Sequence, residues 1–488
     1  MTATSSTDVS DSDPSPSGPA STAQVLAPTE PGTSPKYLGG RVLRRYALWY
    51  GVALAAFSSI WGGVGTLLLP NQVQTLEVAR FFTGRDAGTD LQKLTALKNA
   101  IAAGTATATP DQSRLLGILA DFDAGRAGSL ALVTSVGLVA TMVAQPLIGV
   151  FSDRTRTRMG RRAPWILLGS LVGAAFLVAV RFAPTVAVLV VLWAIASVAL
   201  NAAVSPLGAT LADRVVETQR GSLSAIGGFG SFLGGVLGSV GAGVALSTLG
   251  LNSYFVFAGL VVLSVVLFVT RAKDGSSRDL RVAKFAWKPF LLGFTYAVRT
   301  RDYFWVWTAR ILLTFGYGVS GALGFYMLQS YVKPALSVSE ATKLVPLLAL
   351  TALPATVVAI LVAGPLSDRL KRRKSFVFAA SILMAASMGI PLISPTVTAL
   401  FVQAVVAGFA FGIYIPVDQA LVVDVLPDPN AAGRDLGVAG LAINLGQALG
   451  PALAGSVVSL SGGYTFVWVA ALALVALAAL AVLPVRRP

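Results

Sequence analysis

The chain has 488 residues, of which 55% are hydrophobic and only 12% charged, and its mean hydropathy is +0.74, values typical of a membrane protein rather than a soluble domain. Cysteine and histidine are both absent, which excludes disulfides, thiolate metal sites and histidine acid–base chemistry. The formal charge of +15 resides mostly in short loops between apolar stretches, so membrane topology explains it better than a nucleic-acid partner does.

Residues 1–40 are rich in Ser, Thr, Pro and Asp, and we expect a disordered tail there, with no removable signal peptide. From Tyr46 onward, apolar runs recur that are long enough to cross about 30 Å of hydrocarbon. They predict twelve transmembrane helices, over residues 46–69, 129–151, 164–182, 185–211, 222–248, 252–270, 303–332, 343–366, 375–394, 397–423, 435–460 and 462–484.

The distribution of basic residues predicts the orientation. The segments on the side of both termini carry 27 lysines and arginines, whereas the short opposite loops carry only Arg181, Lys333 and Lys343. Short cytoplasmic loops hold such an excess, so both termini are expected in the cytoplasm of a plasma-membrane protein. The expected units are a bundle over 41–270, a cytoplasmic linker over 271–301 and a second bundle over 302–488.

The segment 70–128 interrupts the first bundle. Its six basic residues balance six acids, and it is too long for the charge rule to govern. We expect an external loop with short surface helices over Leu91–Ala103 and Ser113–Asp123. The sequence leaves open whether this insertion is a lid over the external mouth or a simple surface elaboration.

One basic motif occurs twice, as GVFSDRTRTRMGRRAPW over Gly149–Trp165 and as GPLSDRLKRRK over Gly364–Lys374. The aspartates Asp153 and Asp368 are 215 residues apart. Asp213 and Asp424, each at the end of the fourth helix of a half, are 211 residues apart. The nearly constant offset indicates that a six-helix unit was duplicated.

The first copy resembles the signature hairpin of the major facilitator superfamily, in the form found in sucrose transporters and glycoside-pentoside-hexuronide cation symporters. Gln145-Pro146, the Arg161-Arg162-x-Pro164 ending and Leu211-Ala212-Asp213 also fit that branch. The resemblance implies an all-α membrane protein in which twelve transmembrane helices form two pseudo-symmetric six-helix bundles. It also implies secondary transport.

The resemblance further implies a charge latch between the halves, made when the outside is open and broken when the inside opens, with Asp153 paired to Arg434 and Asp368 paired to Arg220. Gly149 would permit close helix packing beside it. The alternative is that these arginines only follow the positive-inside rule. The full candidate set for the latch is Gly149, Asp153, Arg154, Gly160, Arg161, Arg162, Asp213, Arg220, Gly364, Asp368, Arg369, Asp424 and Arg434.

The fifth and eleventh predicted helices are rich in glycine, which suits either a sliding seam between the halves or ordinary helix packing. These glycines are Gly230, Gly234 and Gly238, then Gly437, Gly446, Gly450 and Gly455.

Two charges fall inside predicted helices, Arg310 in the seventh and Asp418 in the tenth, and such residues are functional candidates. They could couple transport to a proton or form a permanent structural pair. Neither coupling pattern of the related branches is complete here. Sucrose transporters keep an arginine at the position that Gly208 occupies here. The acids that the sodium-coupled relatives carry in their first, second and fourth helices are also missing.

The remaining polar and aromatic residues inside the helices suit a sugar, which needs amide and hydroxyl partners and an aromatic plane. Each amide could equally serve as a structural bond between helices. The substrate-binding candidates are Trp61, Gln72, Gln145, Asn201, Tyr317, Tyr326, Gln329, Tyr414, Gln419, Asn444 and Gln447.

We therefore expect a secondary active transporter that moves a small polar solute, a sugar or glycoside, by alternating access with proton symport. No Walker phosphate loop, metal cluster or nucleophile–base set is visible, so we expect no enzyme activity, no cofactor and no metal. The expected partners are the solute, the lipid bilayer and a co-transported proton. The alternatives are an exporter of drugs or lipid-like compounds with the same fold, and a sensor that no longer transports.

Overall fold

The computed structural model describes residues 38–278, 298–427 and 432–486, and these residues form helices, turns and loops without a strand. Most of the expected tail and much of the expected linker lie outside the described residues, as do the side chains of residues 432–434. The helices that matter below are α1 (Gly40–Ser59), η2 (Ile60–Leu68), α2 (Leu69–Phe81), η3 (Gly84–Asp86), α3 (Leu91–Ala102), α4 (Pro110–Arg154), α5 (Ala163–Val180), α6 (Val186–Arg214), α7 (Glu217–Leu249), η4 (Gly250–Asn252), α8 (Ser253–Arg271), α10 (Arg301–Ala322), α11 (Gly324–Ser330), α12 (Val338–Leu370), α13 (Arg373–Ile393), α14 (Val397–Asp424), α15 (Ala432–Ser461) and α16 (Thr465–Val482).

Ten helical stretches of the described chain are long and apolar enough to cross a bilayer, and the pair α10 and α11, bent by 47°, makes an eleventh. One of the ten, Thr218–Arg271, contains both α7 and α8, which are joined by the short turn η4. The described residues thus hold a helix for each of the twelve predicted segments, and the expected all-α membrane fold is confirmed.

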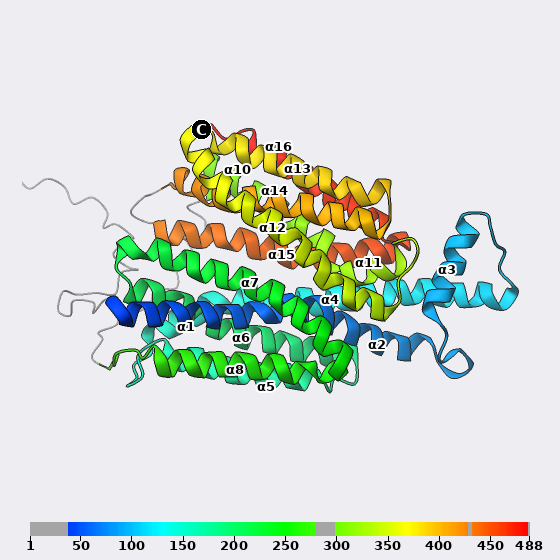
Figure 1. The fold of residues 1–488 in the computed structure, drawn as a ribbon, viewed down its shortest axis with the longest axis horizontal. Helices are drawn as coiled ribbons and strands as arrows, with labels where there is room; N and C mark the ends of the chain where they lie inside the picture. Colours follow the sequence, from blue (N-terminus) through cyan, green and yellow to red (C-terminus); the bar gives the residue numbers. More distant parts are fainter. Residues whose placement is uncertain (1–37, 279–297, 428–431, 487–488) are drawn as a thin grey trace, which may run out of the picture.

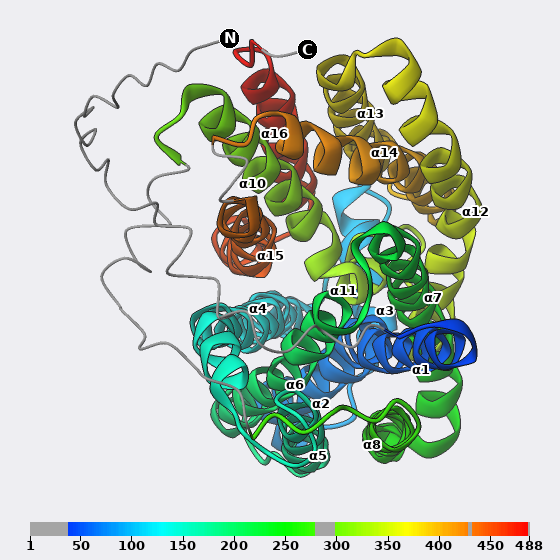
Figure 2. The ribbon, with the colours of Figure 1, turned by 90° about the vertical axis from the view of Figure 1, so that its left-hand side faces the viewer.

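The helices form two bundles that lie side by side along the long axis (Figures 1 and 2). The first contains α1 and α4 to α8, and the second contains α10 to α16. The bundles meet along two lines, α4 against α15 and α7 against α12. Gly455 of α15 lies against Ala131 of α4, and Gly243 of α7 lies against Pro346 of α12.

The two ends of the molecule differ. One end, here called the hairpin face, carries the connections α4–α5 and α12–α13 and the described ends of the chain (Figure 1). The opposite end, the insertion face, carries α3 and the turns that flank it. Pro146 is the one proline that interrupts α4 after its first turn, and Thr109 begins that helix with a capping box to Gln112.

The insertion differs from the expected external loop. The first transmembrane helix runs on without a break through α2 to Phe81, and α4 already begins at Pro110. Forty-five residues give α4 a length of about 68 Å, roughly twice the hydrocarbon thickness. The expected short helix Ser113–Asp123 is therefore the first part of α4, whereas the one at Leu91–Ala103 is present as α3.

Gly230, Gly234 and Gly238 of α7 face α1 of the same bundle rather than the seam between the bundles, whereas Gly243 reaches α12 across the seam. A Cβ on Gly234 would lie 2.2 Å from the carbonyl oxygen of Ala55, and one on Gly238 would lie 2.5 Å from that of Ser59. Both neighbours belong to α1, so these glycines let two helices of the same bundle touch backbone to backbone. In α15, Gly450 likewise lies against Gly318 of α10, whereas Gly455 does reach the other bundle.

Candidate functional site

At the hairpin face of the first bundle, one arginine binds two aspartates. Arg162, at the start of α5, lies 2.5 Å from Asp153 at the end of α4 and 3.0 Å from Asp213 at the end of α6. Arg161 also binds Asp213, and Ser152 accepts a further hydrogen bond from Arg162. This clamp ties the ends of three helices together, and only 8% of the Arg162 side chain is exposed.

The second bundle repeats the arrangement. Arg373, the first residue of α13, lies 2.8 Å from Asp368 near the end of α12 and 2.5 Å from Asp424, the last residue of α14. Arg162 and Arg373 are 211 residues apart, the same offset as Asp213 and Asp424. Arg373 was not among the expected latch residues, because it lies within a row of basic residues that positive-inside topology explains equally well.

In this structure the described partners of the two aspartates are not those of the expected latch, which stays a prediction because it is made only when the outside is open. Asp153 and Asp368 are bound within their own bundles, and Arg220 donates to the carbonyl oxygens of Val215 and Ala212. The arginine at the start of the next helix is close in sequence to each aspartate, so it reaches the carboxylate without any contact between bundles. The Arg434 side chain lies outside the described residues; Arg154 is half-buried and Arg369 is exposed.

The three glycines of the candidate set have different surroundings. A Cβ on Gly149 would meet nothing within 4 Å, and one on Gly364 would make ordinary contact with Pro416, so neither permits the expected close packing. Gly160, in contrast, has φ +88°, and a Cβ added to it would clash with the side chain of Asp274. Only glycine fits that conformation and that space without strain. The hairpin is thereby held against residues that follow α8.

The two charges inside the second bundle do meet. Arg310 Nη2 lies 2.5 Å from the Asp418 carboxylate, and its Nε donates to the same oxygen over 2.7 Å. Gln419 and the carbonyl oxygen of Ala439 accept further hydrogen bonds from the guanidinium. Both charged side chains are at most 6% exposed. Tyr414, also a substrate candidate, is buried one helical turn before Asp418.

Two substrate candidates join the bundles. The Asn444 side chain of α15 donates to the Gln145 side chain of α4 over 3.2 Å, one residue before the proline that interrupts α4. Gln447 is exposed one turn further along α15, and Tyr317 of α10, 42% exposed, stacks on Phe411 with 4.8 Å between ring centroids.

Other substrate candidates serve packing within the first bundle or beneath the insertion face. Gln72 is 2% exposed and donates to the carbonyl oxygen of Val180, and Asn201 donates to that of Ser197. The Trp61 ring meets Trp193 edge to face at 5.9 Å. Tyr326 donates to the carbonyl oxygen of Pro70 from a fully buried position.

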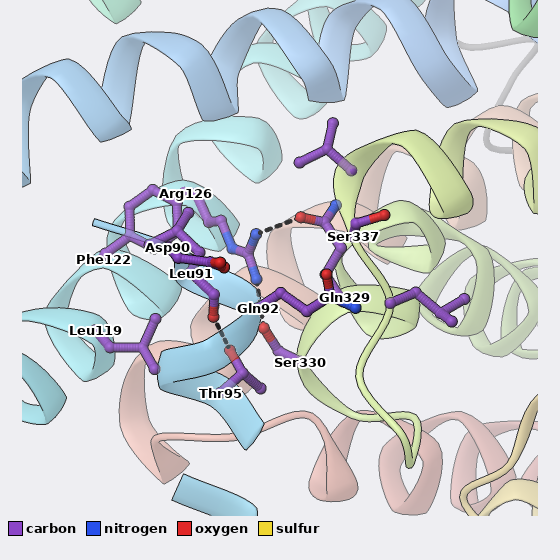
Figure 3. A pocket seen from close by; sticks show the side chains of 12 residues that line it. Asp90, Leu91, Gln92, Thr95, Leu119, Phe122, Arg126, Gln329, Ser330 and Ser337 are labelled. Atoms are coloured by element: carbon purple, nitrogen blue, oxygen red, sulfur yellow. Dashed lines mark hydrogen bonds between the residues drawn. The ribbon is translucent and has the colours of Figure 1, made fainter. Parts of the chain in front are cut away.

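A buried polar network at the insertion face was not foreseen from the sequence, apart from Gln329 (Figure 3). Arg126 of α4 is 2% exposed and pairs with Asp123 one turn earlier over 2.7 Å. From the same guanidinium, hydrogen bonds reach Ser330 over 2.5 Å and Gln329 over 3.4 Å, both in α11 of the other bundle. Gln74 of α2 donates to Gln329 over 2.8 Å.

Aromatic rings and a cavity complete this insertion-face network. The Arg126 guanidinium lies 4.9 Å from the centroid of the Phe122 ring and 4.6 Å from that of Tyr326, within the range of cation–π attraction. A cavity of about 230 Å³ beside it is lined by Arg126, Gln329 and α3 (Figure 3). The charge balance of residues 70–128 concealed this network, because the same pattern is typical of an exposed helix.

Comparison with known proteins identifies the family. Residues 124–484, well over half of the chain, match the family model "MFS/sugar transport protein". The chain is 29% identical over 148 residues to a probable folate-biopterin transporter 7 of Arabidopsis thaliana, covering 28% of this chain and 32% of the relative. It is 28% identical over 160 residues to a general alpha-glucoside permease of Schizosaccharomyces pombe, covering 29% of each.

The fold agrees with solved structures. The nucleoside transporter NupG superposes with a TM-score of 0.61 at 14% identity, covering 92% of this chain and all of that one. The match spans less than a third of the length of each of the two curated relatives, whereas the structural match spans nearly the whole chain. The predicted superfamily is confirmed, and the chain belongs to the MFS/sugar transport protein family.

Proposed function

We propose that this protein is a secondary active transporter that moves a small polar solute, a sugar or glycoside, across the plasma membrane by alternating access. Membership of a sugar transport family and the partial match to an alpha-glucoside permease support a sugar-like solute. The amides, hydroxyls and aromatic rings on helices of both bundles are the groups that such a solute needs.

The observation that carries the proposal is the position of the bonds between the bundles. The described hydrogen bonds between the bundles lie one after another toward the insertion face. They join Asn444 to Gln145, then Ser135 to Ala448, and then Arg126 to its partners in α11. At the hairpin face, both arginine clamps bind within their own bundles. This pattern is what a transporter closed at the insertion face requires, and the opposite access state requires these bonds to open.

In this proposal the buried Arg310–Asp418 pair couples transport to a proton. A carboxylate that is buried against a guanidinium stays charged while the pair is intact, and it gains a proton when the pair is separated. Movement of α10 relative to α14 would therefore change proton affinity at Asp418. The competing role is a permanent structural bond, since breaking a buried pair leaves an unpaired charge.

Flux in proteoliposomes tests both parts. The parent is expected to accumulate a radiolabelled glycoside when an inward proton gradient is imposed, from a panel chosen by ligand-induced thermal shift. Asp418→Asn keeps the shape and one hydrogen-bond acceptor, so it should retain exchange of solute across the membrane and lose accumulation. If Asp418→Asn accumulates solute with an unchanged pH dependence, coupling lies elsewhere.

The same assay separates the alternatives. An exporter of drugs or lipid-like compounds would move apolar dyes and ignore sugars, and a sensor would bind a ligand without moving it.

With the hairpin face in the cytoplasm, as the basic residues indicate, impermeant reagents outside the cell should reach residues of α3 and not the α4–α5 hairpin.

A further inference from the structure

A second cavity opens at the hairpin face of the first bundle, where its lining residue Arg214 directly follows the clamp residue Asp213. It has a volume of about 460 Å³ and lies between the first turns of α1 and the end of α8. Four cationic residues line it, together with apolar ones such as Val42: Arg45, Arg214, Arg271 and Lys273.

Among the described residues, only one of these four cations has an acidic partner. Arg214 pairs with Asp274 over 3.1 Å and lies over the Tyr46 ring. Among the described residues, Arg45, Arg271 and Lys273 form no ion pair. The first turn of α1 contains no acidic residue, and Gly39 provides no side-chain cap there. The positive end of the helix dipole therefore adds to three cations that have no acidic partner in the described part of the chain.

Exposed apolar side chains continue from the cavity along both helices. Arg45 begins a stripe on α1 that continues at Leu48 and Val52, which are 60% and 38% exposed. Thr270 ends a stripe on α8 that includes Leu263 and Val266, 58% and 39% exposed. The spacings of three and seven residues keep each stripe on one side of its helix.

We propose that this cavity binds the headgroup of an anionic phospholipid from the leaflet at the hairpin face. The phosphate lies among Arg45, Arg271 and Lys273, and the acyl chains run along the apolar stripes of α1 and α8. Tyr46 and Phe268, with ring centroids 6.0 Å apart, hold the two helices together behind the lipid. Basic pockets between transmembrane helices are suited to such headgroups. This inference is independent of the transported solute.

Titration of the purified full-length protein in neutral detergent tests the proposal, with thermal stability as the readout. Phosphatidylglycerol should raise the unfolding midpoint, and phosphatidylcholine should not. The triple variant Arg45→Gln/Arg271→Gln/Lys273→Gln should weaken the apparent affinity for phosphatidylglycerol about 100-fold, because each of the three cationic groups contributes about fivefold.

A matched control removes three exposed charges from the same face outside the cavity: Arg156→Gln/Arg158→Gln/Lys371→Gln. It should leave the affinity within about twofold, since long-range attraction to the face would be equal in both variants. Val42→Trp fills the cavity without changing charge, and it should also weaken binding, which separates occupancy of the cavity from charge alone.

Three results would overturn the proposal. Equal weakening by both triple variants would show attraction to the face as a whole. An equal midpoint shift with inorganic phosphate would show a free-anion site, and an equal shift with phosphatidylcholine would show that the headgroup charge is irrelevant. If the first triple variant is unstable without lipid, Val42→Trp decides the outcome.

Discussion

Arg162 and Arg373 hold equivalent positions in the two bundles, and each binds two aspartates of its own bundle. Each clamp therefore holds helix ends together inside one bundle, and neither of these two arginines pairs with the other bundle among the described residues.

We expect Arg162→Gln to destabilise the protein more than Arg373→Gln does. The side chain of Arg162 is 8% exposed and that of Arg373 is 26% exposed. Loss of Arg162 therefore leaves two aspartates, Asp153 and Asp213, that solvent screens less than it screens the partners of Arg373. The expected cost is about 2 kcal/mol for Arg162→Gln and about 1 kcal/mol for Arg373→Gln. The check is the thermal midpoint in detergent. Lys371→Gln, which removes an exposed charge beside the clamp, should change nothing.

The insertion-face network should hold the bundles closed. Its ion pair, Arg126 with Asp123, lies within one helix, so opening leaves that pair intact and breaks the hydrogen bonds to Gln329 and Ser330 and the contact with the Tyr326 ring. Arg126→Ala is expected to shift the equilibrium toward opening at this face by about tenfold, from one or two hydrogen bonds to a charged group.

The chain has no cysteine, so a single Ala131→Cys reports on the seam beside Gly455. Its labelling by a maleimide should accelerate about tenfold in the Arg126→Ala background. The matched control is Arg114→Ala, because Arg114 lies on the same helix and pairs with Asp86 inside the insertion. Unchanged labelling in Arg126→Ala, or equal acceleration in the control, would contradict this role. Gln329→Glu should slow labelling, because it creates an ion pair between the bundles.

Two glycines of α15 give an opposed pair of predictions. A Cβ on Gly455 would lie 2.4 Å from the Cβ of Ala131 across the seam, whereas one on Gly437 would meet nothing within 4 Å. Gly455→Ala should push α15 away from α4 and lower the thermal midpoint by several degrees. Gly437→Ala should raise it slightly, from about 0.5–1 kcal/mol of helix propensity. Equal effects would mean that this seam is not tightly packed.

The Asp86–Arg114 pair should keep its stabilising effect on the insertion as the pH falls from 8 to 5. Two hydrogen bonds from Arg114, of 2.6 and 2.7 Å, lower the pKa of Asp86 below its ordinary value. A group with a lowered folded pKa contributes stability above its unfolded pKa, and that stability is lost as pH falls through the folded pKa. The measurement is a short pulse of trypsin at neutral pH, given after incubation at each pH from 8 to 5. The protection of Arg85 against cleavage should therefore stay constant over this range. Asp86→Asn should reduce this protection at every pH.

The membrane fold was predictable because its signals are local. Apolar length identifies the helices, and the repeat of Asp153 at Asp368 identifies the duplication. The ends of α14 differ from the prediction by one residue at most. The Arg310–Asp418 contact was also foreseen, because a charge inside the membrane needs an opposite partner.

The rest depends on distances that a sequence pattern does not contain. Glycine spacing shows that one side of α7 is smooth, yet it does not say whether α1 or the other bundle covers that side. Likewise, an aspartate at a helix end needs a cation, but several arginines lie within reach. The structure selects Arg162 and Arg373 because each begins the next helix beside the carboxylates.

A single helix connects the two faces. From Asp123 and Arg126 at one end to Asp153 at the other, α4 contains one proline, Pro146, and is otherwise uninterrupted. The 30 residues from Asp123 to Asp153 rise about 45 Å along the helix, so a tilt of α4 by about 5° displaces one of these ends relative to the other by about 4 Å. In the proposed transport cycle, a movement of α4 at the insertion face would therefore reach the hairpin face through this one helix, without a chain of relayed side-chain contacts.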